Sequence, residues 1–146
     1  MKIEQAALTD ITELAVLFDA YRVFYKQESD IAGAERFLTE KISNRQSVIY
    51  IAKDAGRAVG FTQLYPIYSS VRMKNAWLLN DLFVDEDERG KGIADLLLKQ
   101  AALLGAETEC GWLLLQTAND NLRAQHVYER NGWKKDEIFY SYYFRY

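Results

Sequence analysis

The sequence predicts an α/β domain, in which a mixed, mostly antiparallel sheet carries helices on both faces. Segments with strand and helical periodicity follow one another in the order β-α-α-β-β-β-α-β-α-β. The turn Asp54-Ala55-Gly56-Arg57 has the length of a hairpin connection, so we expect antiparallel strands on either side of it. The strand–helix–strand unit from Leu78 to Gln116 predicts one parallel pair with a right-handed crossover.

The first half of the chain is expected to form four strands and two helices. The expected ranges are strand 2–5, helix 10–25, helix 31–44, and strands 47–53, 58–65 and 75–84. Asp10 precedes Glu13 at the spacing of a helix N-cap, which sets the start of the first helix. Pro66, the sole proline, has no N–H for a central ladder, so it should mark a bend or a sheet edge.

The second half is expected to continue with a helix at 92–106, a buried strand at 112–117, a helix at 119–130 and closing strands at 133–146. Strand alternation places two sets of residues on opposite faces of the tail: Ile138, Tyr140, Tyr142, Phe144 and Tyr146 on one, and Phe139, Ser141, Tyr143 and Arg145 on the other. Both faces are aromatic, so we expect a second subunit to cover part of this strand in a homodimer.

Composition limits the possible classes of protein. At 146 residues, we expect a single domain over 1–146. No apolar run is long enough for a membrane span and no signal peptide is visible, so no membrane partner is expected. Cys110 is the only cysteine and His126 the only histidine, which favours a reducing cytoplasm and argues against a metal site. The net charge of −3 argues against a nucleic-acid partner.

One segment joins an apolar strand to a helix through an acidic turn and a Gly-rich loop: Leu82-Phe83-Val84-Asp85-Glu86-Asp87-Glu88-Arg89-Gly90-Lys91-Gly92-Ile93-Ala94. Backbone N–H groups at a helix N-terminus form a binding site for phosphate. Gly90 and Gly92 let the backbone curl and let a bulky anion approach. The alternative reading is an ordinary helix-entry turn.

A second segment follows one helix and one strand later: Asn121-Leu122-Arg123-Ala124-Gln125-His126-Val127-Tyr128-Glu129-Arg130-Asn131-Gly132-Trp133. With both motifs at this separation, the chain resembles the GCN5-related N-acetyltransferase (GNAT) superfamily. The acyl-CoA loop of that superfamily, Arg/Gln-x-x-Gly-x-Gly/Ala, corresponds to Arg89-x-x-Gly92-x-Ala94. The resemblance implies a GNAT-like sheet whose parallel strand pair is splayed. It also implies acetyl-CoA as co-substrate.

The resemblance implies a set of acetyl-CoA-binding residues in both motifs. The backbone of Leu82, Phe83 and Val84 would pair with the pantetheine arm, and the loop Arg89, Gly90, Lys91, Gly92, Ile93 and Ala94 would hold the pyrophosphate. Lys91 could equally be a solvated surface charge. Asn121 would reach the arm, with a first-turn helix residue as the alternative, and Ala124 would be small where the arm passes. Gly132 is expected to end the last helix.

The chemistry of acetyl transfer needs a proton donor for the thiolate and a deprotonated amine. Tyr128 corresponds to the family's general acid, although it could be an aromatic core residue. A backbone N–H near Val84 would polarise the thioester carbonyl. We expect the amine to attack the thioester directly, without an acyl-enzyme intermediate, because the only thiol, Cys110, is interpreted as a small hydrophobic packing residue. His126 lies two residues before Tyr128, so it should point away from it.

The general base is expected on the strand before the loop. Asp81 and Asn80 end the apolar run there and should point to opposite faces by strand alternation. The segment is similar to the Glu-Asp-Leu/Phe-Phe-Val of polyamine- and histone-type acetyltransferases, with Asn80 where that glutamate is usual. Asp81 is therefore the catalytic candidate, with a structural carboxylate or an ordered-water route as alternatives, and Asn80 is expected to line the acceptor pocket.

The acceptor pocket is expected between the first two helices, as the resemblance implies. Tyr21, Tyr25 and Glu28, together with Asp30, could hold an ammonium group by cation–π contact and charge. An apolar helix face followed by a solvated loop is the alternative. The sequence thus predicts an N-acetyltransferase acting on a small primary amine such as a polyamine, amino acid or amino sugar. A protein amine as acceptor and a non-catalytic acyl-CoA-binding module remain the other readings.

Overall fold

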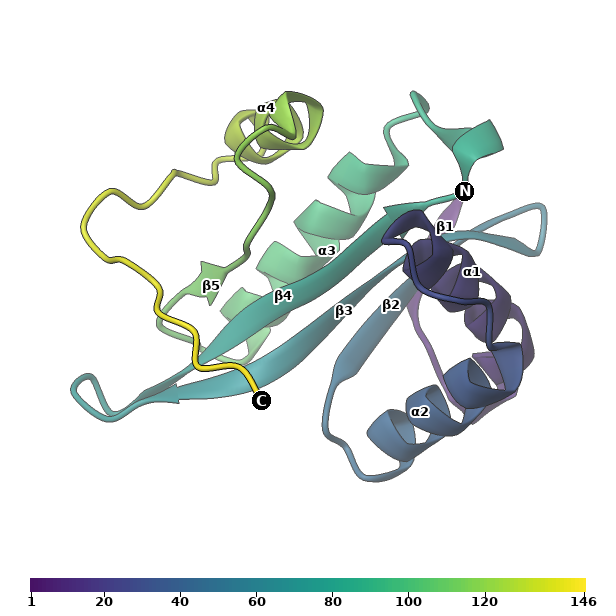
Figure 1. Cartoon of the computed structure of the whole chain (residues 1–146), viewed down its shortest axis with the longest axis horizontal. Coiled ribbons are helices and arrows are strands. Elements are labelled where there is room, and N and C mark those ends of the chain that lie inside the picture. The colour runs from purple at the N-terminus through teal and green to yellow at the C-terminus, as the bar shows by residue number, and fades with distance from the viewer. The chain divides into compact units, whose positions relative to one another are not determined.

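The computed structural model describes all 146 residues, which divide into two compact units, Met1–Gln116 and Thr117–Tyr146. The first unit holds a five-stranded sheet, three α-helices and two short 3-10 helices, and the second holds one α-helix and an extended tail (Figure 1). None of the helices is both long and apolar enough to cross a bilayer.

The sheet has the order β1-β2-β3-β4-β5, with every neighbouring pair antiparallel except β4 and β5. Its strands are β1 (Lys2–Gln5), β2 (Val48–Asp54), β3 (Arg57–Ser69), β4 (Lys74–Val84) and β5 (Leu113–Leu114). The predicted mixed, mostly antiparallel sheet is confirmed, and so is the parallel pair. β5 is shorter than the predicted strand at 112–117. It pairs only through Trp77↔Leu113 and Leu78↔Leu114, so the two strands separate beyond Leu78.

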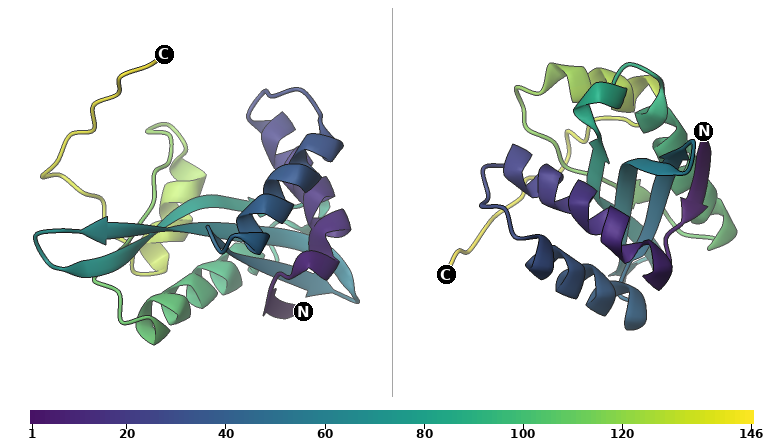
Figure 2. Two further views of the ribbon diagram at one scale, coloured as in Figure 1. Left: turned by 90° about the horizontal axis from the view of Figure 1, so that it is seen from below. Right: turned by 90° about the vertical axis from the view of Figure 1, so that its right-hand side faces the viewer.

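Helices cover both faces of the sheet, as predicted. α1 (Ile11–Phe24) and α2 (Ile31–Ser43) lie on one face and α3 (Ile93–Glu107) lies on the other (Figure 2). The short helices η1 (Leu8–Asp10) and η2 (Glu86–Glu88) precede α1 and follow β4. Leu14 and Leu38 of the first two helices are fully buried against Phe61 of β3. Ile93, Leu97, Leu98 and Ala101 bury the inner side of α3. Burial of this kind stabilises the sheet between the two layers of helices.

The start of α1 is placed correctly by the sequence, but the expected cap is not formed. Asp10 precedes the helix without capping it. Its carboxylate instead accepts hydrogen bonds from Ala7 N (2.8 Å) and from Lys53 Nζ (2.7 Å). The prediction is wrong here because the η1 turn and a lysine on β2 offer the carboxylate stronger partners than the helix backbone does.

Pro66 lies inside β3 rather than after it, since the strand runs on to Ser69. Pairing with β2 ends at Val48↔Leu64, while pairing with β4 continues through Pro66↔Trp77. At Pro66, β3 therefore has a strand on one side only. The predicted sheet edge is confirmed, in keeping with the missing N–H of proline.

The second unit contains α4 (Leu122–Arg130), which begins three residues later than predicted. Gly132 follows it with φ +87°, and Trp133 N donates to Tyr128 O at 3.1 Å, so the predicted C-terminal cap is confirmed. The predicted strands at 133–146 are wrong for the single chain, because these residues form neither helix nor strand. Alternation specifies the two faces of a strand, but a strand also needs a neighbour for its backbone groups, and alternation does not supply one.

Candidate functional site

The end of β4 carries an open backbone edge. Asp85 N donates to Val59 O at 3.0 Å, which makes these residues a hydrogen-bonded pair. Antiparallel alternation makes Phe83↔Phe61 the next such pair, so Leu82 and Val84 direct their N–H and C=O groups away from β3. Because β5 ends its pairing at Leu78, these groups meet no strand of the sheet on that side. Of the three residues expected to bind through their backbone, Phe83 instead faces β3.

The turn after β4 ends in a helix N-terminus that no side chain caps. Gly92 is the residue before α3, with φ +77°, and Gly90 has φ +81°. A Cβ at either position would meet no atom within 4 Å, so the space in front of the helix is open. The first N–H groups of an α-helix have no partner within it. Ile93 and Ala94 supply two of these groups, which suits the approach of a phosphate.

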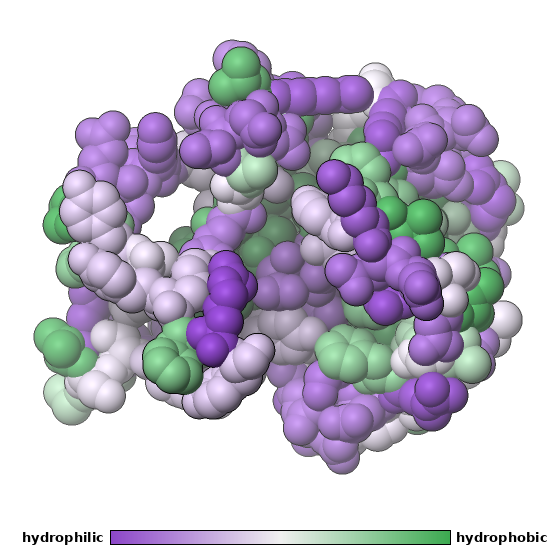
Figure 3. Space-filling model, viewed as in Figure 1, coloured by the Kyte–Doolittle hydropathy of each residue, from purple (hydrophilic) through white to green (hydrophobic).

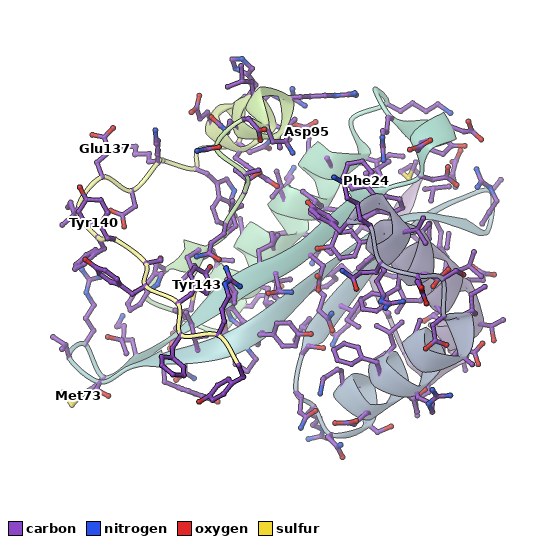
Figure 4. All side chains as sticks on the ribbon, in the orientation of Figure 1. Phe24, Met73, Asp95, Glu137, Tyr140 and Tyr143 are labelled. Carbon is purple, nitrogen blue, oxygen red and sulfur yellow. The ribbon has the colours of Figure 1, made fainter.

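Arg89 and Lys91 flank the loop, and both make contacts within their own chain. Arg89 Nε donates to Val84 O at 3.1 Å, and its guanidinium lies over the rings of Phe83 and Phe24. Phe24 is the last residue of α1 and is labelled in Figure 4. Lys91 Nζ lies 2.6 Å from Glu88 Oε2. Arg89 thus connects the loop to the open edge of β4 and to α1.

A buried hydrogen-bond network surrounds Asp81, which is only 5% exposed. Gln63 Nε2 donates to Asp81 Oδ2 at 2.8 Å, and Gln63 Oε1 accepts from Ser47 Oγ at 2.8 Å. The hydroxyl of Tyr21 on α1 also donates to the carboxylate. The network therefore joins the start of β2, the middle of β3, β4 and the first helix at a single carboxylate.

A β-bulge on β4 brings Asn80 into this network. The register passes from Gln63↔Asp81 to Leu64↔Leu79, so Asn80 has no opposite residue. Asn80 is an exposed residue, yet its Nδ2 donates to Asp81 Oδ1 at 3.0 Å. The expectation that the two side chains diverge to opposite faces is therefore wrong, because an extra residue breaks the alternation on which it depends.

Burial raises the pKa of the Asp81 carboxyl above its ordinary value, although its hydrogen-bond donors act in the opposite direction. Burial and the nearby charge of Asp81 raise the pKa of the Tyr65 hydroxyl to about 12. Tyr65 therefore remains a neutral phenol at physiological pH. The Asp81 carboxylate is thus held in a buried, hydrogen-bonded setting in which its proton affinity is increased.

The expected acceptor residues divide into an ordered aromatic group and an exposed loop. The ring of Tyr21 packs edge-on against Phe61 (5.8 Å between centroids) and against Tyr25 (5.1 Å). Tyr25 and Glu28 are exposed. The Asp30 carboxylate caps α2 by accepting from Gly33 N at 2.8 Å, which gives it a structural role. Only Glu28 of the two expected loop carboxylates is left for a cation.

In the second unit, α4 presents Asn121, Ala124 and Tyr128 on one face, because they follow one another at three and four residues. Asn121 Oδ1 accepts from Ala124 N at 3.2 Å and so caps the helix. Tyr128 is half-buried and its ring lies 6.5 Å from that of Trp133. His126 is exposed, as expected from its position two residues before Tyr128.

The structure thus brings together Asp81, predicted as catalytic, with Asn80 and Tyr21, predicted to line the acceptor pocket. It also adds three residues that sequence reasoning missed, namely Ser47, Gln63 and Tyr65. Gln63 left one signal, since it is a polar residue in the middle of an apolar strand. Cys110 is half-buried with its Sγ 3.4 Å from Trp112 O, a structural setting.

Comparison with known proteins gives a consistent result. Residues 14–133 match the sequence model of the acetyltransferase (GNAT) family. The chain is 45% identical over 142 residues to the uncharacterized N-acetyltransferase YhfO of Bacillus subtilis, covering 97% of this chain and 95% of that protein. A probable acetyltransferase of Haemophilus influenzae is 30% identical over 95% and 96% of the two chains.

Solved structures show the same fold. A crystal structure of a probable acetyltransferase superposes with a TM-score of 0.96 at 38% identity, covering 100% of this chain and 98% of the other. A ribosomal-protein-alanine N-acetyltransferase from Brucella melitensis biovar Abortus 2308 superposes with a TM-score of 0.82 at 24% identity, covering all of both chains. The relatives named here include no polyamine or histone acetyltransferase, so they do not support the expected nearness to that branch.

Proposed function

Because this chain belongs to the acetyltransferase (GNAT) family, we propose that it transfers the acetyl group of acetyl-CoA to a primary amine of a small molecule, such as a polyamine, amino acid or amino sugar. It is an acyltransferase by family. The observation that carries the proposal is the buried Asp81 carboxylate, which lies on the same strand as the open edge at Leu82 and Val84. A proton acceptor and an unpaired backbone edge are thus adjacent on β4.

Acetyl-CoA binding is assigned to residues of both motifs. The N–H and C=O groups of Leu82 would pair with the amides of the pantetheine arm, since Arg89 Nε already occupies the Val84 carbonyl. The uncapped N-terminus of α3 and the open space at Gly90 and Gly92 support pyrophosphate binding along residues 89–94. On α4, the face of Asn121 and Ala124 would follow the arm.

The reaction we propose is direct attack. The amine nitrogen forms a bond to the thioester carbonyl carbon, the C–S bond breaks, and the thiolate receives a proton from the Tyr128 phenol. Asp81 accepts a proton from the amine nitrogen, and both groups then exchange protons with solvent. The Val84 N–H, directed to the open edge, would stabilise the negative charge that develops on the carbonyl oxygen.

The acceptor end is assigned to Tyr21, Tyr25, Glu28 and Asn80. Tyr25 and Glu28 are exposed, next to a Tyr21 whose hydroxyl contacts Asp81. An ammonium group approaching Asp81 from this side would meet an aromatic ring and a carboxylate, both of which favour cations.

The test is thiol release from acetyl-CoA with a panel of small amines, peptides with a free N-terminus and lysine peptides, together with acetyl-CoA affinity by calorimetry. Turnover on a small amine supports the proposal. Turnover on peptides alone would assign the enzyme to protein acceptors. Tight acetyl-CoA binding without turnover on any amine would indicate a binding module and overturn the catalytic assignment.

A further inference from the structure

The C-terminal tail, residues 137–146, exposes an unusual amount of apolar surface. Six large side chains are at least 81% exposed: Ile138, Phe139, Tyr140, Tyr142, Phe144 and Tyr146. Their positions along the extended tail can be followed from Glu137, Tyr140 and Tyr143 in Figure 4, and the segment appears as pale to green side chains at the surface in Figure 3. Contiguous apolar surface of this kind marks an interaction site.

The tail sequence is complementary to itself. In a two-fold symmetric antiparallel ribbon, the axis passes between one residue and the same residue of the other copy. All other residues then pair so that the two residue numbers add up to twice the number of this central residue. When that residue is Ser141, Glu137 lies opposite Arg145 at both ends of the ribbon. A centre at Tyr140 would instead place Lys135 opposite Arg145, and a centre at Tyr142 would place Phe139 opposite Arg145.

The remaining pairs in the Ser141 register are apolar and well matched. Ile138 lies opposite Phe144, Tyr140 opposite Tyr142, and Phe139 opposite Tyr143. Aromatic pairs and opposite-charge pairs directly across a ladder each stabilise it. Neither Glu137 nor Arg145 has an ion pair within its own chain, where the Arg145 guanidinium lies 4.9 Å from the centre of the Tyr143 ring.

The two faces of such a ribbon differ in character. The face with Ile138, Tyr140, Tyr142 and Phe144 from both copies is wholly apolar or aromatic, whereas the other face ends in the two Glu137–Arg145 pairs. An aromatic side chain buries on the order of 150–250 Å². The exposed side chains of one tail therefore offer roughly the 800 Å² that each partner contributes to a stable interface. An isolated two-stranded ribbon is marginal in water, so a stable dimer requires the apolar face of the ribbon to be shielded from water.

From the exposure, the charge pattern and this area, we propose that residues 137–146 pair antiparallel with the same segment of a second copy of the chain, about a two-fold axis at Ser141. The partner is a second copy because, in the register centred on Ser141, Glu137 of each copy lies opposite Arg145 of the other, so that two ion pairs form. The proposal does not depend on the acceptor amine or on catalysis.

The mass of the full chain is measured first, by sedimentation over a wide concentration range. A reversible dimer is expected, and a mass that stays monomeric at all concentrations overturns the proposal. Arg145→Glu places like charges opposite each other twice, so its dimer dissociation constant is expected to rise by roughly tenfold or more. The double variant Glu137→Arg/Arg145→Glu restores the pairs and is expected to return to within about threefold of wild type. Arg36→Glu, at an exposed position of α2, is the control for net charge.

A cysteine pair tests the register independently of charge. In a Cys110→Ser background, Ser141→Cys places two thiols across the two-fold axis, at about the separation that a disulfide or a short thiol cross-linker spans. Tyr143→Cys is the matched control, because its two copies would lie about 13 Å apart along the strands. Rapid cross-linking at 141 and little at 143 is expected. A dimer that cross-links at 143 but not at 141, or that ignores both charge variants, overturns the register.

Discussion

Gln63 and Asp81 face each other across the β3–β4 ladder, with Gln63 Nε2 donating to Asp81 Oδ2 at 2.8 Å. Gln63 is fully buried, and its carbonyl oxygen is occupied by Ser47 Oγ. The amide therefore has a defined orientation, in which its N–H₂ group faces the carboxylate. This relationship makes the protonation of Asp81 depend on a residue that would not touch the acceptor.

Asp81→Asn tests the proposed proton acceptor. Burial raises the pKa of Asp81, so kcat/KM of the wild type should fall with decreasing pH at values above the ordinary carboxyl range of about 4. In the variant, kcat/KM should be lower by roughly 100-fold or more, and its decrease toward acidic pH (the acid limb of the profile) should disappear. Amine acetylation measured from pH 5 to 9 gives the comparison. An acid limb that persists unchanged in the variant would assign it to another group.

The same pKa predicts how stability depends on pH. A carboxyl whose pKa is higher in the folded than in the unfolded protein stabilises the fold fully below its unfolded value, and this contribution is lost as the pH rises through the folded pKa. The free energy of unfolding of wild type should therefore decrease over this interval relative to Asp81→Asn. Urea unfolding of both proteins at several pH values measures the difference. Parallel pH profiles would contradict a raised pKa.

Gln63→Met removes a donor that lowers the pKa of Asp81 while keeping the length of the side chain. The acid limb of kcat/KM should move to higher pH. Thr62→Val is the matched control, since Thr62 is equally buried and its Oγ1 donates to the backbone carbonyl of Asp81 at 2.8 Å. Both variants should lose about 1 kcal/mol of stability. Only Gln63→Met should shift the pH profile, and an equal shift in both would point to a general structural effect.

Tyr128→Phe tests the proton donor. Removing the phenol should lower kcat at least about tenfold while leaving acetyl-CoA affinity unchanged, because the ring and its packing on Trp133 are retained. His126→Ala, on the opposite side of α4 and exposed, should leave kcat at the wild-type value. Steady-state kinetics and calorimetry distinguish the two effects. A Tyr128→Phe enzyme with full kcat would remove Tyr128 from the mechanism.

Gly92→Ala tests the phosphate loop. Gly92 has φ +77° and Gly56, in the β2–β3 hairpin, has φ +80°, with open space at both positions. Alanine at either position should therefore lower the free energy of unfolding by a similar amount. The expected loss is about 1–2 kcal/mol, which is the penalty for an L-residue in the left-handed conformation. Only Gly92→Ala should also raise KM for acetyl-CoA, because only that loop faces the uncapped end of α3. A comparable increase in Gly56→Ala would show that strain alone explains the change.

The order of the elements was predictable because it depends on local periodicity and turn chemistry. The hairpin at 54–57, the parallel pair and the helix-ending Gly132 are of this kind. The loop at 89–94 was located for the same reason, since its glycines and the helix after it are adjacent in sequence.

Long-range features of the site were not predictable in this way. The partner of Gln63 is set by the β3–β4 register, and the bulge at Asn80 shifts that register without any glycine or proline to signal it. The hydroxyl of Tyr21 reaches Asp81 only because α1 packs on β3 through Phe18 and Phe61. The contacts of Asp10 with Lys53 join positions 43 apart in the chain, which no local pattern encodes.

β4 extends beyond β5, and a bare strand edge of this kind tends to recruit strands from other molecules. Arg89 occupies the Val84 carbonyl, one of the acceptors that an incoming strand would need, and fixes a bulky cation beside it. A short ligand that needs few amide partners still fits such an edge, whereas continuous growth by added strands is interrupted. One arginine thereby protects the protein from misassembly at the same edge that we assign to its co-substrate.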